Sequence, residues 1–139
     1  MNDTTNKKRI LVICTHNAAR SQIAEGLLNS LYGDRIEAYS AGTEPTQVNA
    51  YAVKVMAELD IDISQNSSKS VNEFIEQKFD YVVTVCDGAR EACPFFPGAR
   101  EYLHQSFADP STFEGTEKEI LAQVREVREN IRNWIEKTY

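Results

Sequence analysis

The sequence predicts an α/β fold, a three-layer sandwich in which a four-stranded parallel sheet is flanked by helices. Short runs of branched apolar residues, typical of strands covered on both faces, alternate with segments whose apolar residues recur every three or four positions. The chain has 139 residues, of which 42% are hydrophobic and 26% are charged. This is enough for one core, so we expect residues 1–139 to form a single domain.

The first part of the chain predicts a strand, a loop and a helix. Lys8–Cys14 is a short apolar run rich in branched residues, which predicts a buried strand. Beyond the loop, Ile23, Leu27 and Leu31 recur every four residues and predict an amphipathic helix. Gly33 follows this stripe, and we expect it to supply the left-handed cap that ends the helix.

The middle of the chain predicts another strand and two helices. Arg35–Ser40 is expected to be the second strand, followed by a turn or loop over Ala41–Pro45 because that segment contains glycine and proline. A polar, acidic segment covers Asp60–Ser70, and a short helix is predicted over Val71–Gln77. Before that segment, a helical stripe is formed by Val53, Met56, Ala57 and Leu59.

The last part of the chain predicts two strands and a long helix. Tyr81–Cys86 is expected to be the third buried strand, and Glu101–Phe107 a fourth strand near the edge of the sheet. Thr116 and Glu119 form a capping-box pattern at the start of the helix. The helix should pack on the sheet through an apolar stripe made of Ile120, Val124, Val127, Ile131 and Trp134.

Composition limits the possible partners and compartments. The net charge is -6, so no general attraction to nucleic acid or to anionic membranes is expected, and any anion site must be made locally. No apolar run has the length of a membrane span, and the polar start Met1–Asn6 lacks the apolar core of a signal peptide. We therefore expect a cytoplasmic protein. Three cysteines in a reducing compartment argue against a disulfide framework.

The segment between the first strand and the first helix predicts an oxyanion site. Ligands of parallel sheets bind beyond the carboxyl ends of the strands, where this loop lies. Backbone N–H groups of a tight loop and a helix start can surround an oxyanion, and Arg20 can hold two of its oxygens. The same positive field favours the thiolate of Cys14, the nucleophilic form, and Ser21 can donate to its sulfur. The oxyanion-binding loop is Thr15, His16, Asn17, Ala18, Ala19, Arg20 and Ser21.

The hypothesis also needs a general acid, and the loop has a simpler alternative interpretation. Asp109, fixed by the proline that follows it, is the candidate for protonating a leaving oxygen. Taken alone, an aspartate followed by proline is usually a turn. The alternative for the loop is a buried cysteine that ends a strand, followed by an arginine that reaches the solvent from an ordinary helix.

With these residues identified, the chain resembles the low-molecular-weight protein tyrosine phosphatase fold family. It is more closely similar to the thioredoxin-coupled arsenate reductases within that fold. The resemblance extends over nearly the whole chain, through Cys14–Ser21, Ser21–Gly26, Tyr39–Gly42, Asp60–Ser64, Val82–Cys86, Cys93–Pro94 and Asp109–Pro110.

The resemblance implies a reaction and its residues. Cys14 attacks arsenate while Arg20 holds the oxygens and Asp109 assists the loss of water. Cys86 then attacks Cys14, which releases arsenite, and Cys93 attacks Cys86 to carry the disulfide outward for thioredoxin. No bound cofactor and no metal are expected, since the electrons come from an external dithiol. A role in arsenical resistance follows.

The resemblance also implies support for the loop. Some members of the family bind potassium through residues that match Asn17, Glu25, Ser40 and an acidic residue further on. That last position falls at Lys69 here, whose ammonium could replace the cation and pair with Glu25, although a solvated surface lysine is the simpler interpretation. His16 and Ala19 also differ from many related reductases. His16 either favours anion entry when protonated or points to solvent.

Spacing adds an argument of its own about the two later cysteines. If the segment between Cys86 and Cys93 were helical, their α-carbons would lie roughly 10 Å apart along the axis. A disulfide tolerates no more than about 7 Å. We therefore expect this segment to unwind when oxidised, and Gly88 lowers the cost.

Other functions remain open at this point. One is a low-molecular-weight protein tyrosine phosphatase that uses Cys14 and Asp109, with Cys86 and Cys93 as a protective or regulatory redox pair. Another is a non-catalytic redox-sensing or anion-binding module, which would leave the thiolate and the acid without a purpose. Ser111 follows the aspartate and proline where phosphatases of this fold usually place aromatic side chains, which favours a smaller anion. Zinc is a weak alternative because the cysteines lack a close pair. We expect a monomer, with glutaredoxin or another dithiol as alternative reductants.

Overall fold

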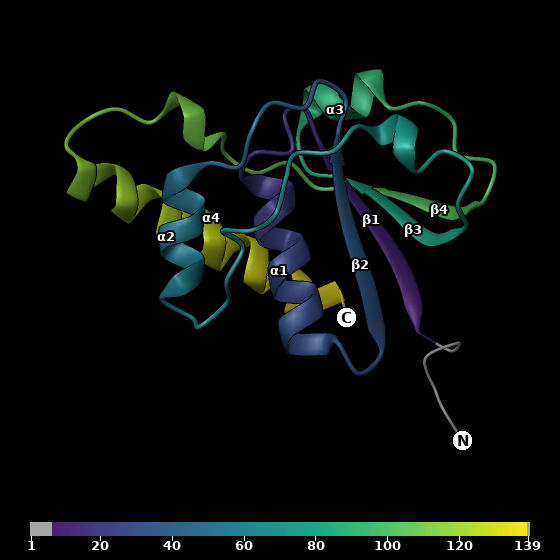
Figure 1. Cartoon of the computed structure of the whole chain (residues 1–139), viewed down its shortest axis with the longest axis horizontal. Coiled ribbons are helices and arrows are strands. Elements are labelled where there is room, and N and C mark those ends of the chain that lie inside the picture. The colour runs from purple at the N-terminus through teal and green to yellow at the C-terminus, as the bar shows by residue number, and fades with distance from the viewer. Residues whose placement is uncertain (1–6, 139) are drawn as a thin grey trace.

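The computed structural model describes residues 7–138 (Figure 1). Its strands are β1 (Lys8–Cys14), β2 (Ile36–Gly42), β3 (Phe79–Thr84) and β4 (Ala99–His104). Its α-helices are α1 (Arg20–Tyr32), α2 (Ala50–Ala57), α3 (Asp87–Ala92) and α4 (Glu117–Thr138). Two short 3-10 helices are η2 (Val71–Glu73) and η3 (Pro110–Thr112). The predicted class, an α/β fold with a four-stranded parallel sheet and helices, is confirmed.

The sheet has the strand order β2-β1-β3-β4, so β1 lies inside it and β4 at an edge. Ile10, Leu11, Val12 and Ile13 are all fully buried. Successive side chains of a strand point to opposite faces, so both faces of β1 are covered. The predicted bounds of β1 and the edge position of the fourth strand are confirmed.

The other three strands differ from the prediction by about two residues. β2 continues through Ala41 and Gly42, which were predicted to be in a turn, because Gly42 pairs with Cys14 in the parallel register. β3 and β4 begin and end earlier than predicted, since Phe79 pairs with Ala99 at their start. Apolar composition alone does not show where the ladder of hydrogen bonds begins.

The helix α1 buries a face that the spacing predicted only in part. Ile23 and Leu27 are fully buried, but Leu31 is 42% exposed at a surface pocket between the end of α1, the loop after α2, and α4. The prediction of a left-handed cap at Gly33 is wrong, because this residue has a right-handed conformation with φ of -61°. The turn is closed instead by the N–H of Arg35, which donates to the carbonyl of Tyr32 at 3.0 Å.

The two smaller helices of the middle segment also depart from the predicted pattern. In α2 the buried residues include Val55 and Met56, whereas Ala57 is exposed and Val53 is only half-buried. Asn49 caps α2 by accepting two backbone N–H bonds, which sets the rotation of the helix. The helix predicted over Val71–Gln77 is shortened to η2 and followed by a turn.

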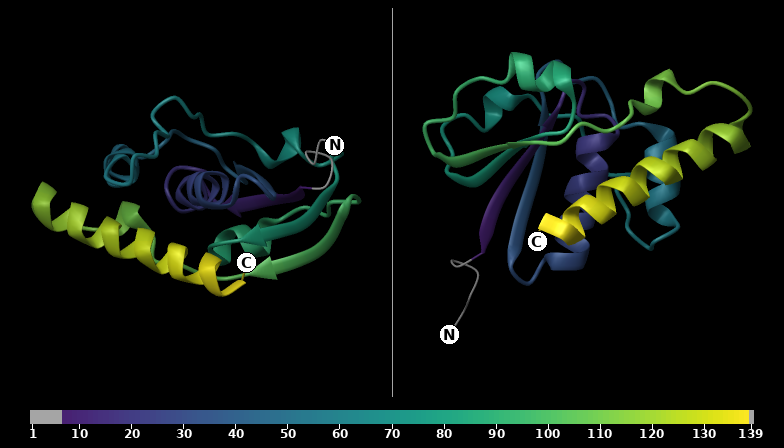
Figure 2. Two further views of the ribbon diagram at one scale, coloured as in Figure 1. Left: turned by 90° about the horizontal axis from the view of Figure 1, so that it is seen from below. Right: turned by 180° about the vertical axis from the view of Figure 1, so that it is seen from behind.

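The helix α4 confirms the predicted capping box but not its packing partner. Thr116 and Glu119 exchange the two capping hydrogen bonds, at 2.9 and 3.2 Å. The chief contacts of α4 are with α1 and α2 rather than with the sheet. In Figure 2 it runs across both of these helices. Its predicted stripe is buried at Val124, Val127 and Ile131. No helix among residues 7–138 is long and apolar enough to cross a membrane.

Candidate active site

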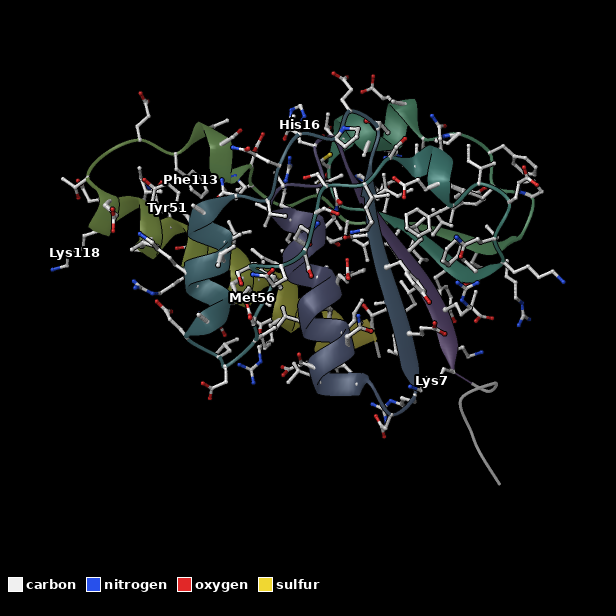
Figure 3. All side chains as sticks on the ribbon, in the orientation of Figure 1. Lys7, His16, Tyr51, Met56, Phe113 and Lys118 are labelled. Atoms are coloured by element: carbon white, nitrogen blue, oxygen red, sulfur yellow. The ribbon has the colours of Figure 1, made fainter. Side chains whose placement is uncertain are left out.

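The predicted oxyanion loop lies at the carboxyl end of β1, between that strand and α1. Figure 1 places this end of the sheet at the top, beside α3. His16 also lies at the top of the molecule in Figure 3. The loop backbone is hydrogen-bonded to the segment after β2, because the N–H groups of Glu44 and Thr46 donate to the carbonyls of Thr15 and His16.

The thiol of Cys14 is buried and surrounded by hydrogen-bond donors. Its Sγ lies 2.9 Å from the Ser21 hydroxyl oxygen and accepts a backbone N–H from Asn17 at 3.1 Å. Cys14 is 2% exposed. Donors directed at a sulfur stabilise its thiolate more than its thiol. The same donors can receive the charge that returns to this sulfur when it acts as a leaving group.

Asn17 determines the conformation of the loop. It is fully buried and has a φ of +50°, which non-glycine residues adopt rarely and at a cost. Its amide Nδ2 donates to Ser21 Oγ at 2.7 Å, and its Oδ1 accepts from Gln22 Nε2 at 3.0 Å and from the Lys69 N–H at 2.9 Å. Ser68 Oγ donates to its carbonyl. The left-handed turn is therefore held from several directions.

Gly42 supports the loop from the neighbouring strand. A β-carbon at this position would lie 2.7 Å from the carbonyl oxygen of Thr15 and 2.9 Å from the backbone nitrogen of Asn17. Both contacts are with backbone of the loop, which cannot move aside as a flexible side chain can. Only glycine therefore lets β2 approach the loop this closely.

Arg20 and Asp109 meet at a small pocket over the sulfur. Arg20 Nη2 lies 3.5 Å from Asp109 Oδ2, and its Nη1 donates to the carbonyl of Phe107 at 3.3 Å. Arg20 is 8% exposed, so its guanidinium is largely desolvated. The pocket is lined by Cys14, His16, Ala18, Ala19, Arg20, Asn49, Asp109 and Ser111. This arrangement can hold a tetrahedral anion between a nucleophile and a carboxyl group.

The surroundings of Asp109 lower the pKa of its carboxyl group. Partial burial opposes its charge, but the backbone N–H and hydroxyl of Ser111 donate to it at 3.0 and 2.8 Å. Together with the charges of Arg20 and His16, these bonds hold the pKa of Asp109 below its ordinary value. A carboxyl group that acts as an acid must carry a proton, which this lowered pKa disfavours.

Cys86 lies at the other side of the same loop. Its Sγ is 3.3 Å from Thr15 Oγ1, and its side chain caps α3 by accepting the N–H of Ala89 at 3.4 Å. Cys86 is 5% exposed. The fold therefore brings a second buried thiol, from the end of β3, against the loop that contains Cys14.

Cys93 stands at the far end of α3. The six-residue helix Asp87–Ala92 separates it from Cys86, so the helix on which the spacing argument depended is present. The thiol is half-buried, lies 3.4 Å from the Pro94 carbonyl, and has its pKa raised by burial. All three cysteines are free thiols.

The predicted support residues surround the base of the loop. Ser40 donates a hydrogen bond to Glu25, whose burial raises its pKa above the ordinary value even though Ser40 and the charge of Lys69 oppose this. Lys69 Nζ donates to the carbonyl of Ser67 at 3.0 Å and forms no direct ion pair with Glu25. The ammonium acts on Glu25 through space, not as a bonded partner.

Three further predicted loop residues line the pocket over Cys14. His16 is half-buried, lines the pocket, and donates from Nδ1 to the carbonyl of Glu44 at 3.0 Å. Ala18 and Ala19 line the same pocket. Between residues 7 and 138, no group of three histidine, cysteine or acidic side chains is placed to hold a metal ion.

Several residues of the site were not predicted from the sequence. Asn49 and Ser111 line the pocket, and Gln22 and Ser68 hold Asn17. Asn49 and Ser68 are distant in sequence and polar, as loop residues commonly are, so no local pattern marked them. The contact of Ser111 with Asp109 could have been predicted, because a serine two residues after an aspartate often donates back to its carboxylate.

Comparison with known proteins agrees with this geometry. A model of the family described as low molecular weight phosphotyrosine protein phosphatase matches residues 9–138. A protein of Halalkalibacterium halodurans named arsenate reductase is 45% identical over 126 residues, which cover 91% of each chain. The match therefore includes every predicted site residue of the described chain.

Solved structures of similar fold lead to the same relatives. An arsenate reductase in a phosphate-binding state superposes with a TM-score of 0.75 at 30% identity, over 94% of this chain and 98% of that one. A thioredoxin-dependent arsenate reductase of Corynebacterium glutamicum has a TM-score of 0.64 at 28% identity. That match covers 98% of this chain and 65% of the other.

The close approach of Gly42 to the loop predicts the effect of adding one carbon atom. In Gly42→Ala the new β-carbon displaces the loop backbone, and we expect roughly 100-fold weaker binding of inorganic phosphate, since small misplacements of such loops are costly. Titration calorimetry measures this. Thr43→Ala is the matched control and should bind normally. Equal phosphate affinity of Gly42→Ala and wild type would contradict the argument.

The lowered pKa of Asp109 predicts a dependence of stability on pH. Because its pKa is lower in the folded state, the carboxylate stabilises the fold above the ordinary aspartate pKa of about 4, and this contribution is lost as pH falls below it. The free energy of unfolding of wild type minus that of Asp109→Asn should be constant from pH 6 to 8 and shrink below about pH 4. Urea denaturation measures it. In Ser111→Ala the free energy of unfolding should depend less on pH in this range. If the difference between wild type and Asp109→Asn grows as the pH falls below about 4, the prediction is wrong.

Proposed function

Because the chain belongs to the low molecular weight phosphotyrosine protein phosphatase family, we propose that it is an arsenate reductase that uses Cys14, Cys86 and Cys93 as a relay. The observation that carries the proposal is the second buried thiol, with Cys86 Sγ 3.3 Å from Thr15 Oγ1 of the catalytic loop. Ester hydrolysis on Cys14 needs no such thiol. Reduction does, because two electrons must leave the protein as a disulfide.

The first step uses the pocket over Cys14. Arsenate, a tetrahedral anion like phosphate, binds the loop N–H groups and Arg20 in place of the Asp109 carboxylate, 3.5 Å from the guanidinium. The thiolate of Cys14 attacks arsenic and forms a sulfur–arsenic bond, while one oxygen departs as water. Asp109 delivers a proton to that oxygen once the anion has brought it into the pocket. Arsenic stays pentavalent.

The second step transfers the electrons. The thiolate of Cys86 attacks Sγ of Cys14, the sulfur–arsenic bond breaks, and its electron pair stays on arsenic. Arsenite, which is trivalent, leaves, and a disulfide joins Cys14 and Cys86. Ser21 and the N–H of Asn17, which contact Cys14 Sγ at 2.9 and 3.1 Å, favour the first attack by stabilising the thiolate.

The third step moves the disulfide outward. The thiolate of Cys93 attacks Sγ of Cys86, which releases the thiolate of Cys14 and leaves Cys86 and Cys93 joined. Helical spacing keeps the two α-carbons roughly 10 Å apart, so α3 has to unwind before the bond can form. Gly88, exposed in the first turn of α3, makes that change less costly. Thioredoxin, a dithiol protein, then reduces this disulfide.

The base of the loop can work without a bound cation. Burial raises the pKa of Glu25, and the charge of Lys69 compensates part of that effect. Lys69 also reaches the loop through its backbone, which donates to Asn17 Oδ1 at 2.9 Å. We therefore propose that Asn17, Glu25, Ser40 and Lys69 support the loop together and that no potassium ion is needed.

The surroundings in which such an enzyme works follow from its chemistry. Free thiols persist in a reducing compartment, so the cytoplasm is the proposed location. No bound cofactor is required, since arsenate takes its electrons from the cysteines and these are restored by thioredoxin. We propose that the enzyme acts as a monomer.

Single-turnover experiments on two cysteine variants test the relay. Cys86→Ser should release no arsenite, because nothing attacks the Cys14 adduct, while weak phosphatase activity persists. Cys93→Ser should release about one arsenite per enzyme and then stop as the disulfide between Cys14 and Cys86. Arsenite release and mass spectrometry of trapped disulfides measure both. If phosphatase activity is the main activity of the wild type and is kept in Cys86→Ser, and if arsenate only inhibits that activity, the chain is a hydrolase.

Replacing Lys69 tests the support without potassium. Wild-type activity should be equal in potassium and sodium chloride at one ionic strength. Lys69→Asp, which adds an oxygen ligand near Glu25 and removes the competing ammonium, should become faster in potassium by roughly tenfold. Lys78→Asp makes the same charge change on the exposed surface and should not respond. A wild-type enzyme that is strongly and specifically activated by potassium would disprove the proposal.

A further inference from the structure

A cluster of polar side chains joins the ends of β3 and β4 to the first turn of α3. His104 Nδ1 lies 2.7 Å from the hydroxyl of Thr84, and His104 Nε2 lies 3.1 Å from Asp87 Oδ1 and 2.9 Å from Ser106 Oγ. The Ser106 hydroxyl donates to the same Asp87 oxygen at 2.7 Å. None of these four residues contributes to the pocket over Cys14.

One arrangement of hydrogens satisfies the bonds of His104 to both Asp87 and Thr84. Nε2–H donates to the Asp87 carboxylate, which can only accept, and Nδ1 then accepts from the Thr84 hydroxyl. Thr84 is 5% exposed and belongs to β3, so this end of the cluster is anchored in the sheet. The two hydrogen bonds to Asp87 lower the pKa of that carboxyl. The cluster therefore links the sheet to the residue that follows Cys86.

The cluster depends on α3 being helical. Asp87 is the first residue of the helix, and its side chain reaches His104 from that conformation. The helix has six residues, fewer than two turns. A helix this short cannot lose one turn and keep the rest, because formation of a helix is cooperative. Unwinding it for a disulfide between Cys86 and Cys93 therefore frees Asp87 from His104 and Ser106.

We propose that His104 is a positioning residue for the relay, which clamps the first turn of α3 in the dithiol state and is released when Cys86 and Cys93 form their disulfide. The inference rests on the proposed function. A contact present only in the dithiol state favours that state. The clamp formed by Thr84, His104, Ser106 and Asp87 therefore makes the disulfide a stronger oxidant, which an external dithiol reduces more readily.

Two substitutions of His104 separate the clamp from the packing of β4. In His104→Asn the short amide can still meet Thr84 but cannot reach Asp87, whereas in His104→Gln the longer amide can donate to Asp87. We expect the exchange equilibrium of the Cys86–Cys93 disulfide with dithiothreitol to shift about fivefold toward the disulfide in His104→Asn, roughly 20 mV more negative. His104→Gln should stay within about twofold of wild type, roughly 9 mV.

Two further variants complete the design. Ser106→Ala removes the other bond to Asp87 and should shift the equilibrium in the same direction. Asp62→Asn is the matched control, since Asp62 also accepts a serine N–H and hydroxyl, from Ser64, but lies far along the chain from α3. It should leave the equilibrium unchanged. Amide exchange of residues 87–92 in the dithiol form should be faster in His104→Asn than in His104→Gln.

The outcomes distinguish this inference from the proposed function. If arsenate turnover by wild type leaves no disulfide between Cys86 and Cys93, the relay is wrong and the clamp has no role in it. If that disulfide forms, but His104→Asn and Ser106→Ala keep the wild-type equilibrium, only the clamp is wrong. A shift of His104→Gln equal to that of His104→Asn would also overturn it, because packing and not the bond to Asp87 would then be responsible.

Discussion

The left-handed backbone of Asn17 is the constraint on which the site depends. A positive φ at a residue with a side chain costs free energy, so it persists only where the surroundings impose it. Here Gln22 from α1 and Lys69 from the segment before η2 both bond to its side chain, and its amide holds Ser21. The result is an N–H directed at Cys14 and a hydroxyl held at the same sulfur. The donors at this sulfur are thus held in place by contacts with the rest of the fold.

The parallel sheet brings the other groups to this loop without further constraints. Because β1, β2 and β3 all run in one direction, their carboxyl ends lie side by side at the same end of the sheet. Gly42 ends β2 and lets it touch the loop backbone, while Cys86 follows β3 and reaches Thr15. The chain beyond β4 returns Asp109 to Arg20. The carboxyl end of one sheet therefore brings together two buried thiols, a guanidinium and a carboxylate.

Much of this could be predicted from the sequence, because the decisive signals were local. The apolar run before Cys14, the spacing from Cys14 to Arg20 and the capping box at Thr116 each specify their own structure. Signals that depend on pairing were misread: Gly42 was assigned to a turn, although it ends a strand against the loop. Leu31 fits the helical period, but its side chain is only partly covered and is 42% exposed. The contacts of Asn49 and His104 join segments distant in sequence, and no local pattern encodes them.

The short length of α3 fits two requirements that the proposed relay places on Cys86. In the proposed relay, Cys86 is held against the loop to attack Cys14, and it then meets Cys93 after a change of backbone conformation. A long helix would be too stable to unwind for one disulfide, while an unstructured segment would leave Cys86 without a fixed position. A helix of six residues is marginal alone, so its stability comes from contacts at its start, including the cap by the Cys86 sulfur itself. In the proposed relay the same sulfur takes part in both disulfides, first with Cys14 and then with Cys93. The proposed disulfide chemistry therefore takes place on the sulfur that caps α3, and so acts directly on the helix that has to unwind.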